Sequence, residues 1–404
     1  MSLIERIERD GPKKLLAIDG GGIRGVLALG VLQGIEDLLK AKSGRADFRL
    51  ADYFDYIAGT STGGIIAAGL SIGMSVGEIL TFYQEAGAQM FVKANLLRRL
   101  RYKFEDEPLA AKLREVFASD TTLGSEKLQT LLLLVMRNAT TDSPWPISNN
   151  PHARYNARTR EDCNLSLPLW QLIRASTAAP TYFPPEVIVL PSAAPAGERE
   201  FVFVDGGVTM YNNPAFQMFL MATLDRYWAA KPEARWQPGT KRMLIVSVGT
   251  GTSPAARQGL DPDEMNLLFN ATTIPSALMF AALNEQDLLC RVFGDCRAGD
   301  EIDREVGDLI GSAGPLQQAQ KLFTYLRYNA ELTREGLDAL GCRDIEPNTV
   351  QQMDSIEGIP ELRRVGHESP KPRCWSAIST ASCRTEKAAQ PPPFEIEPTR
   401  RQTS

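Results

Sequence analysis

The sequence predicts an α/β fold with a largely parallel sheet covered by helices on both faces. Short apolar runs such as Lys13–Asp19 and Lys241–Val248 are typical of strands that are buried on both sides. These runs alternate along the chain with longer segments of helical periodicity, the first of which is Gly25–Lys40. Such alternation favours parallel strands, because each return to the same edge of a sheet needs a crossover helix.

The other expected elements follow in chain order. A second strand at Phe54–Ala58 leads into a turn of small residues, and a small-residue helix follows that turn. Further strands are expected at Lys127–Arg137, Glu186–Leu190 and Glu200–Val204. Further helices are expected at Ser75–Ala88, Leu109–Ala118 and Leu167–Ala178, and within Ala256–Phe293 and Val350–Val365.

Residues 1–367 are expected to form one domain. Hydrophobic residues make up 43% of the 404 residues, which is enough for a sizeable core, and no linker or internal repeat divides the segment. From residue 368 onward, proline, serine, threonine and charged residues dominate. A segment of this composition cannot bury enough apolar surface to fold, so residues 368–404 are predicted to be a disordered, proline-rich tail.

Composition argues against several classes of function. The net charge of −5 does not suit a general affinity for nucleic acid, which usually needs a basic face. With six cysteines, no C-x-x-C pair and two histidines, no zinc site is expected, and reduced thiols in the cytoplasm are the simpler interpretation. The charged first residues do not resemble a signal peptide, and apolar runs such as Leu131–Met136 are too short to span a membrane. Any contact with lipid is therefore expected to be peripheral.

The segment Gly59–Gly63, GTSTG, places a serine between a predicted strand and a predicted helix. A nucleophilic serine on such a tight turn has strained backbone dihedrals, and flanking glycines avoid clashes there. The turn would lift Ser61 Oγ above the carboxyl end of the sheet, at a helix N-terminus whose dipole favours developing negative charge. An ordinary turn of small residues is the alternative, because G-x-S-x-G occurs often by chance.

A second glycine-rich turn, DGGGIRG at Asp19–Gly25, also follows a strand and opens a helix. Consecutive glycines let backbone N–H groups approach an anion closely, which suits the oxyanion of an acyl transfer. Gly20, Gly22 and Gly25 also match the G-x-G-x-x-G of a dinucleotide site. That site would need an acidic residue at the end of the next strand, where this chain has the serine turn instead.

A nucleophilic serine needs a base, and the chain offers two histidines and one well-placed aspartate. His152 lies in a polar loop candidate, and His367 lies at the edge of the predicted tail, where a base would not be held firmly. The order Ser61, Asp205, His367 nevertheless matches an α/β-hydrolase triad. Asp205 is the better candidate because it follows an apolar strand, and burial would raise its pKa. A turn-forming Asp-Gly is the alternative.

Taken together, these segments resemble the patatin-like phospholipase family. The resemblance rests on DGGGIRG at Asp19–Gly25, GTSTG at Gly59–Gly63 and DGG at Asp205–Gly207, with RASTAAP at Arg174–Pro180 ahead of the aspartate. It covers about residues 12–255, and the ordered run of motifs is much more specific than any one of them. The resemblance implies a three-layer α/β/α, Rossmann-like fold with a mostly parallel central sheet.

The resemblance also implies a role for each matching residue. The family uses a Ser–Asp dyad without a histidine, so Ser61 would be the nucleophile and Asp205 its base. The oxyanion hole would consist of the backbone N–H groups of Gly20, Gly21 and Gly22. The residues expected to support the site are Arg24, Gly59, Gly63, Gly206 and Gly207. This chemistry requires no metal and no other cofactor.

The activity implied by the resemblance is that of a serine lipid acyl hydrolase, of the phospholipase A or lysophospholipase type. Such an enzyme cleaves fatty acyl esters of membrane lipids through an acyl-enzyme. The same dyad would also serve a general esterase, a thioesterase or an acyltransferase. A non-catalytic module that binds nucleotide or protein is the alternative from another class, and the intact serine and aspartate argue against it.

One further segment, Gln89–Phe104, combines five basic residues with apolar ones and has no acidic residue. An amphipathic segment of this composition suits a membrane surface, with its apolar groups among the headgroups and its cations on lipid phosphates. It therefore predicts peripheral membrane contact. A core helix with a solvated basic face is the alternative.

Overall fold

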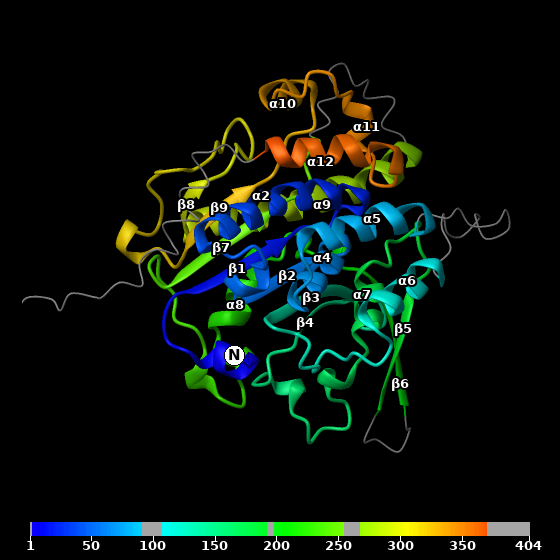
Figure 1. Ribbon diagram of the computed structural model, residues 1–404, viewed down its shortest axis with the longest axis vertical. Helices are drawn as coiled ribbons and strands as arrows, with labels where there is room; N and C mark the ends of the chain where they lie inside the picture. The colour runs from blue at the N-terminus through cyan, green and yellow to red at the C-terminus, as the bar shows by residue number, and fades with distance from the viewer. Residues whose placement is uncertain (1, 91–106, 192–197, 254–266, 370–404) are drawn as a thin grey trace, which may run out of the picture.

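The computed structural model describes residues 2–90, 107–191, 198–253 and 267–369. Within these ranges, a nine-stranded and mostly parallel sheet lies between two layers of helices (Figure 1). This arrangement confirms the α/β class and the mostly parallel central sheet that were expected.

The strands are β1 (Lys13–Ile18), β2 (Tyr56–Thr60), β3 (Leu131–Asn138), β4 (Ser143–Ser148), β5 (Glu186–Pro191), β6 (Glu198–Asp205), β7 (Met243–Val248), β8 (Asp295–Ala298) and β9 (Thr324–Tyr328). Hydrogen-bonded neighbours follow the path β5-β6-β3-β2-β1-β7-β9-β8, and β4 pairs with β3 off this path. Strands β3, β2, β1, β7, β9 and β8 run parallel to one another. Strands β4, β5 and β6 form antiparallel pairs.

The pairing of β3 brings two loops together that are far apart in the sequence. Along one edge, β3 pairs in parallel with β2 as far as Thr60, which lies opposite Val135. Its other edge is taken by β4. Strand β6 must therefore pair on the β2 edge, and it does so in the opposite direction, with Asp205 opposite Met136. As a result, β2 and β6 meet carboxyl end to carboxyl end, and the turn after β2 lies beside the last residue of β6.

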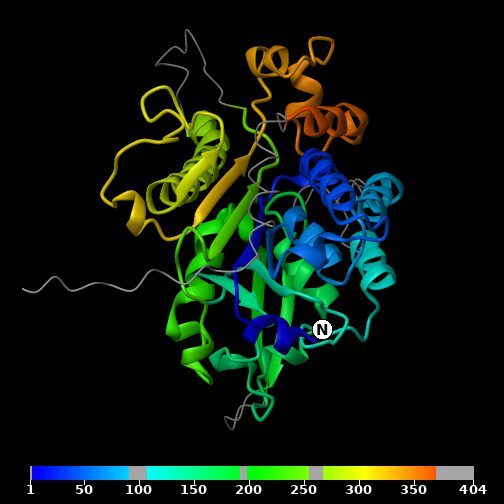
Figure 2. The ribbon, with the colours of Figure 1, turned by 60° about the vertical axis from the view of Figure 1, so that its left-hand side comes forward.

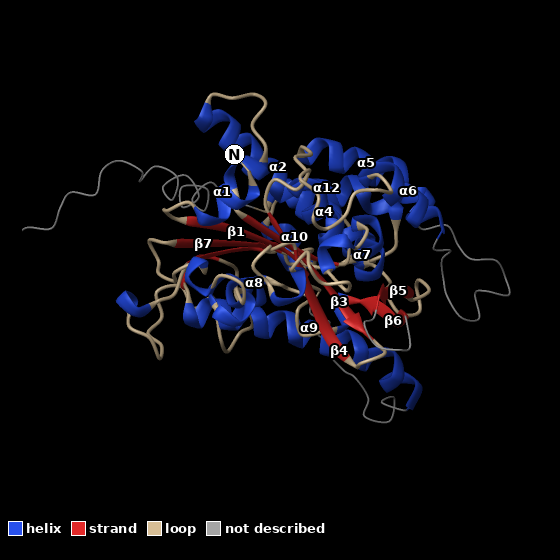
Figure 3. Cartoon of the chain, turned by 90° about the horizontal axis from the view of Figure 1, so that it is seen from below, coloured by secondary structure: helices blue, strands red, loops and turns tan. Residues whose placement is uncertain are grey.

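Two layers of helices cover the sheet, as Figure 3 shows from below. One face carries α2 (Gly25–Ser43), α4 (Thr62–Ser71), α5 (Val76–Met90), α6 (Glu107–Phe117), α7 (Leu169–Ser176) and α12 (Ile359–Glu368). The other carries α8 (Ala215–Thr223) and α9 (Leu267–Phe293). The short helices are α1 (Leu3–Glu8), α3 (Leu50–Tyr53), α10 (Arg334–Ala339) and α11 (Pro347–Gln351). Helix α12 packs against α2, so the last described helix shares a layer with the first long one (Figure 2).

Side-chain alternation along the strands divides the core into two parts. In β1, Leu16 and Ile18 belong to the core under α2 and α4, whereas Leu15 and Ala17 belong to the core under α8. All four side chains are fully buried. Burial on both faces explains why these strands are continuous apolar runs and do not alternate with polar residues.

The structure differs from the expected elements in several places. Strand β2 runs two residues later than expected, because Gly59 and Thr60 still pair with β3. Strand β4 was not expected, because Pro144 and Pro146 are typical strand breakers; they are tolerated here on a strand that pairs with β3 alone among the described strands. In the region Val350–Val365, where helices were expected, α11 and α12 are separated by residues 352–358. Strands β8 and β9 carry no clear sequence signal.

Several expectations fall outside the described residues. These are the basic segment from residue 91 onward, the start of the 256–293 helical region, and the tail from residue 370. Among the helices in the described ranges, none combines the length and apolarity that crossing a bilayer needs.

Candidate active site

Ser61 occupies a strained turn between β2 and α4. Its backbone has φ 55° and ψ −127°, a positive φ that residues other than glycine rarely adopt. The flanking glycines allow close packing there: a Cβ on residue 59 would collide with the Gly63 carbonyl, and a Cβ on residue 63 would collide with the Ile18 carbonyl. The turn therefore has the geometry expected for a nucleophile elbow.

A buried serine of α7, Ser176, stabilises this turn through a hydrogen bond. Ser176, the last residue of α7, accepts a hydrogen bond from the Ser61 N–H at 2.9 Å. The Ser176 hydroxyl in turn donates to the Val135 carbonyl of β3 at 2.6 Å. The strained residue is thus tied to the sheet, and its own N–H is already engaged.

The hydroxyl of Ser61 meets the carboxyl of Asp205. Ser61 Oγ donates to Asp205 Oδ2 at 2.5 Å, and the Gly207 N–H donates to Asp205 Oδ1 at 2.6 Å. Both side chains are largely buried, with 8% of Ser61 and 5% of Asp205 exposed. Gly206 allows this approach, because a Cβ there would collide with the Val135 carbonyl. The two residues singled out in the sequence are therefore hydrogen-bonded partners.

Burial makes Asp205 a stronger base than an aspartate in water. Desolvation raises the pKa of its carboxyl from 3.8 to about 6. The hydrogen bonds from Ser61 and from the Gly207 N–H, and the positive charge of buried Arg174, lower this pKa and so offset part of the rise. A carboxylate whose pKa lies near neutrality can accept a proton from a hydroxyl under attack more readily than an exposed one.

The glycine loop after β1 lies next to Ser61. If residue 20 had a Cβ, that atom would lie 3.2 Å from Ser61 Cβ. The Gly20 N–H is not free, because it donates to the Asn212 carbonyl at 3.2 Å. The N–H groups of Gly21 and Gly22 have no acceptor among the described residues. Gly22 has φ 62°, which suits glycine, and these two N–H groups are the available backbone donors of the loop.

Distant parts of the chain hold the loop in place. Thr250 Oγ1 donates to the Gly20 carbonyl at 2.9 Å, and the Ile23 N–H donates to the Met353 carbonyl at 2.8 Å. Asp19, directly before the glycines, receives two hydrogen bonds from Arg327 of β9, at 2.6 and 3.0 Å.

Arg24, expected to support the loop, is buried within it. Its exposed fraction is 9%, and desolvation lowers the pKa of its guanidinium to about 10, with the charge of Asp19 opposing that change. The Arg24 Nε lies buried without a hydrogen-bond partner among the described residues. The hydrogen bonds that fix Asp19 come from Arg327, a residue that the sequence did not point to.

Neither histidine contacts the dyad. His152 stacks on Trp228 and its Nε2 lies 3.2 Å from Glu8 Oε1. His367 lies on α12, exposed to solvent, with Nδ1 3.6 Å from Glu368 Oε1. The partner of Ser61 Oγ is Asp205.

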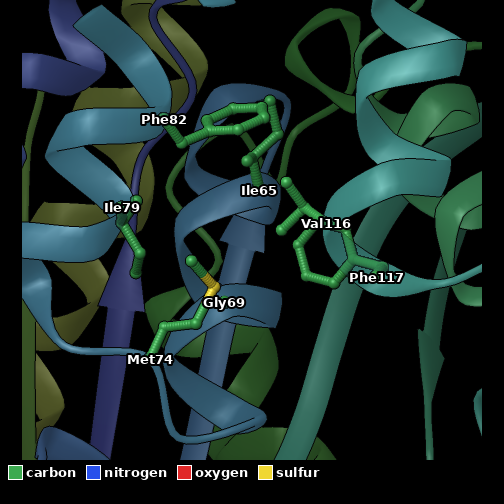
Figure 4. A pocket seen from close by; sticks show the side chains of 7 residues that line it. All are labelled: Ile65, Gly69, Met74, Ile79, Phe82, Val116 and Phe117. Atoms are coloured by element: carbon green, nitrogen blue, oxygen red, sulfur yellow. The ribbon is translucent and has the colours of Figure 1, made fainter. Parts of the chain in front are cut away.

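A small apolar cavity lies between α4, α5 and α6, on the helix that begins at the elbow (Figure 4). Its volume is about 10 Å³, and Ile65, Phe82, Val116 and Phe117 point into it. That volume has room for about one water molecule, so the cavity does not hold an acyl chain in this conformation.

Five residues around the site had no role assigned to them from the sequence. They are Ser176, Asn212, Thr250, Arg327 and Met353, which come from α7, from the loop after Asp205, and from the C-terminal half of the chain. Ser176 lies within the RASTAAP segment, and Asn212 lies seven residues after Asp205. No periodicity or motif could have assigned them a neighbour, because their contacts arise from strand order.

The fold and the site define this protein as an α/β protein with a serine elbow and a glycine loop at the carboxyl edge of its sheet. The chain belongs to the family described as patatin-like phospholipase, whose model matches residues 16–219. The expected family is thereby confirmed.

Similar proteins include plant and bacterial members. Patatin-17 of Solanum cardiophyllum is 33% identical over 251 residues, which cover 59% of this chain and 60% of the relative. A cGAMP-activated phospholipase of Vibrio cholerae is 30% identical over 216 residues, covering 50% of this chain and 56% of the relative. The matches thus span less than two thirds of these relatives. Among solved structures, human GIVD cytosolic phospholipase A2 aligns with a TM-score of 0.46 and 13% identity, covering 94% of this chain and 62% of that one.

Proposed function

We propose that this protein is a serine lipid acyl hydrolase of the phospholipase A or lysophospholipase type. Family membership supports the class of reaction. The observation that carries the proposal is the 2.5 Å hydrogen bond from Ser61 Oγ, on a strained turn, to the buried carboxyl of Asp205. The substrate would be a phospholipid or another acyl lipid.

The geometry suggests how each group would act. Asp205 would accept the proton of Ser61 Oγ as this oxygen attacks the ester carbonyl. The N–H groups of Gly21 and Gly22 would stabilise the oxyanion, whereas Gly20 would first have to release the Asn212 carbonyl. The alcohol or lysolipid would leave with a proton from Asp205, and water activated by the same carboxylate would hydrolyse the acyl-enzyme.

Access to a lipid substrate also calls for a contact with the bilayer. We propose that the basic and apolar segment 89–104 supplies a peripheral contact to anionic lipid. The support is its composition, five basic residues and no acidic one.

The dyad is tested with four forms of the full chain: wild type, Ser61→Ala, Asp205→Asn and the double variant. Each is incubated with a phospholipid mixture, a lysophospholipid, an acyl-CoA and a small soluble ester, and the released fatty acid is measured by mass spectrometry. Both substitutions should lower hydrolysis by at least about 10³-fold, and the double variant should be little worse than either single one, because the groups act as a unit. Each assay is run with and without cGAMP, because the Vibrio relative is named as activated by it.

The matched control is His152→Ala combined with His367→Ala, which should retain most activity. A folded Asp205→Asn protein with near-normal turnover would overturn the dyad. Hydrolysis of the acyl-CoA alone would favour a thioesterase, and transfer of the acyl group to an added alcohol in preference to water would favour an acyltransferase.

A further inference from the structure

Asn212 carries a buried side-chain oxygen that the protein leaves without a partner. The residue is 5% exposed, and its Oδ1 has no hydrogen-bond partner among the described residues. The side-chain oxygen of its neighbour Asn213 differs, because Asn213 Oδ1 accepts from the Ala215 N–H at 3.1 Å and from Ser247 Oγ at 3.3 Å, although Asn213 Nδ2 also lacks a partner among the described residues. Buried polar groups nearly always have partners, so an unpartnered one needs an explanation.

The side-chain amide of Asn212 lies close to Ser61 and Asp205. A Cβ on residue 20 would collide with Asn212 Oδ1 and lie 3.2 Å from Ser61 Cβ. A Cβ on residue 207 would lie 3.3 Å from Asn212 Oδ1 and 3.0 Å from Asp205 Oδ1. The amide therefore lies between the glycine loop and the Asp205 loop, beside both members of the dyad.

The backbone of Asn212 fixes the base of this side chain. Its carbonyl accepts the Gly20 N–H at 3.2 Å, which joins the loop after β6 to the glycine loop after β1. Because that bond occupies the Gly20 N–H, the glycine loop is left with the N–H groups of Gly21 and Gly22. A rotation of the terminal amide by about 180° exchanges Oδ1 and Nδ2, so the same position can present a donor.

We propose that Asn212 is a further catalytic residue, whose Nδ2–H donates to the acyl oxygen that becomes negatively charged when Ser61 attacks. This inference rests on the proposed acyl hydrolase function. It accounts for the position that lacks a partner, because once the amide is rotated the Nδ2–H placed there is free in the resting site and available for charge that develops only in the transition state. Asn212 would also replace the Gly20 N–H as a donor, because the Gly20 N–H is already bonded to the Asn212 carbonyl.

The test compares kcat and KM for a soluble ester in wild type, Asn212→Leu and Asn212→Asp. Leucine keeps the approximate shape but removes all polar atoms, whereas aspartate keeps an acceptor and removes the donor. Both should lower kcat by about 10²–10³-fold, as the loss of one oxyanion donor does elsewhere, while KM changes by less than about threefold. The rates are compared on the plateau of each pH profile, because the added charge of aspartate would raise the pKa of Asp205.

The matched control is Asn213→Ala, which removes the neighbouring amide that the fold itself uses. It should lower Tm and leave kcat per folded molecule near that of wild type. Asn212→Asp, which is isosteric, keeps the test decisive where Asn212→Leu does not fold.

Two outcomes separate this inference from the function on which it rests. If wild type neither hydrolyses any ester nor reacts at Ser61 with a fluorophosphonate, the proposed function fails and the inference fails with it. If wild type is active and Asn212→Asp keeps its kcat, the inference alone is overturned. A rise in KM with kcat unchanged also overturns it, because that pattern shows that Asn212 contributes to substrate binding in the ground state and not to the transition state.

Discussion

At the scale of single residues, Ser61 holds a backbone conformation that a serine adopts only when its surroundings enforce it. Such a conformation costs about 1–3 kcal/mol. The bond to Ser176, which is itself bonded to β3, and the bond to Asp205 enforce it here. In this conformation Oγ is directed at the Asp205 carboxylate.

The carboxyl of Asp205 determines the pH dependence that we expect of hydrolysis. Burial raises its pKa to about 6, and only the ionised form can accept the Ser61 proton. We therefore expect kcat/KM for a soluble ester to rise about tenfold per pH unit below about 6 and to level off above it. A pH–rate profile of the wild type checks this. A plateau that extends down to about pH 4, near the pKa of an exposed aspartate, would contradict the role of a buried base.

Thermal unfolding is a second readout of the same pKa. A raised pKa means that the folded chain binds this proton more tightly than the unfolded chain does. The contribution of Asp205 to stability therefore falls as the pH rises from about 4 through about 6. Asp205→Asn, neutral at every pH, should raise Tm relative to wild type at pH 7, and the difference should shrink towards pH 4. An equal difference at both pH values would mean that the ionisation of Asp205 is not the cause.

At the scale of secondary-structure elements, the site depends on β3 more than on either strand that carries a dyad residue. Strand β2 ends opposite Val135 and β6 ends opposite Met136, so adjacent residues of β3 set the distance between the two loops. The carbonyl of Val135 also anchors Ser176 and lies against Gly206.

The basic segment between α5 and α6 carries the prediction for membrane contact. Replacing Arg98, Arg99, Arg101 and Lys103 with glutamine should weaken binding to anionic vesicles and make it less dependent on salt, because each basic residue contributes about 1 kcal/mol near such a surface. Hydrolysis of a small soluble ester should persist. Vesicle co-sedimentation at several salt concentrations measures the binding.

The matched control for this segment removes the same charge elsewhere. It replaces four basic residues that form no ion pair among the described residues: Arg226, Arg235, Lys241 and Arg242. Vesicle binding should be retained in this variant. An equal loss in both variants would attribute the effect to net charge, and unchanged binding in the first would exclude the segment as the docking surface.

At the scale of the whole molecule, a buried ion pair joins the two ends of the chain beneath the site. Arg327 of β9 is 3% exposed and Asp19 is fully buried; the arginine also donates to Ser247 Oγ at 2.7 Å. Breaking such a pair by removing one partner typically costs about 3–5 kcal/mol, because the other charge stays buried and unpaired. Arg327 lies outside the segment that matches the family model, yet it holds Asp19, the residue that precedes the glycine loop.

We therefore expect Arg327→Met and Asp19→Asn each to lower the free energy of unfolding by about 3 kcal/mol or more, and the double variant to lose less than the sum. Urea denaturation measures all four proteins. Arg364→Gln is the control, because the Arg364–Asp344 pair has the same 2.6 Å distance but is exposed to solvent; its unfolding free energy should stay close to that of wild type. Strict additivity of the two core substitutions would contradict a coupled pair.

The sequence by itself determined the class of fold, the family, and which serine and aspartate to examine. These are local properties: continuous apolar runs report burial on both faces of a sheet, and glycines around Ser61 and after Asp205 report close backbone approaches. The same local patterns predict the bounds and the number of strands less well. Strand β4 was not expected, since it contains two prolines, and β2 starts and ends two residues later than expected, because the turn residues still pair.

Only the tertiary structure decided which residues surround the dyad. The order of strands brings Ser176, Asn212, Thr250, Met353 and Arg327 to one edge of the sheet, and no sequence pattern encodes that order. The structure also shows that the Gly20 N–H donates to the Asn212 carbonyl, whereas the motif alone would have counted this N–H as a free donor. The pKa of Asp205 likewise depends on burial by segments far away in the chain. A motif specifies which groups are present, whereas their hydrogen bonds and desolvation arise from contacts made only when the whole chain has folded.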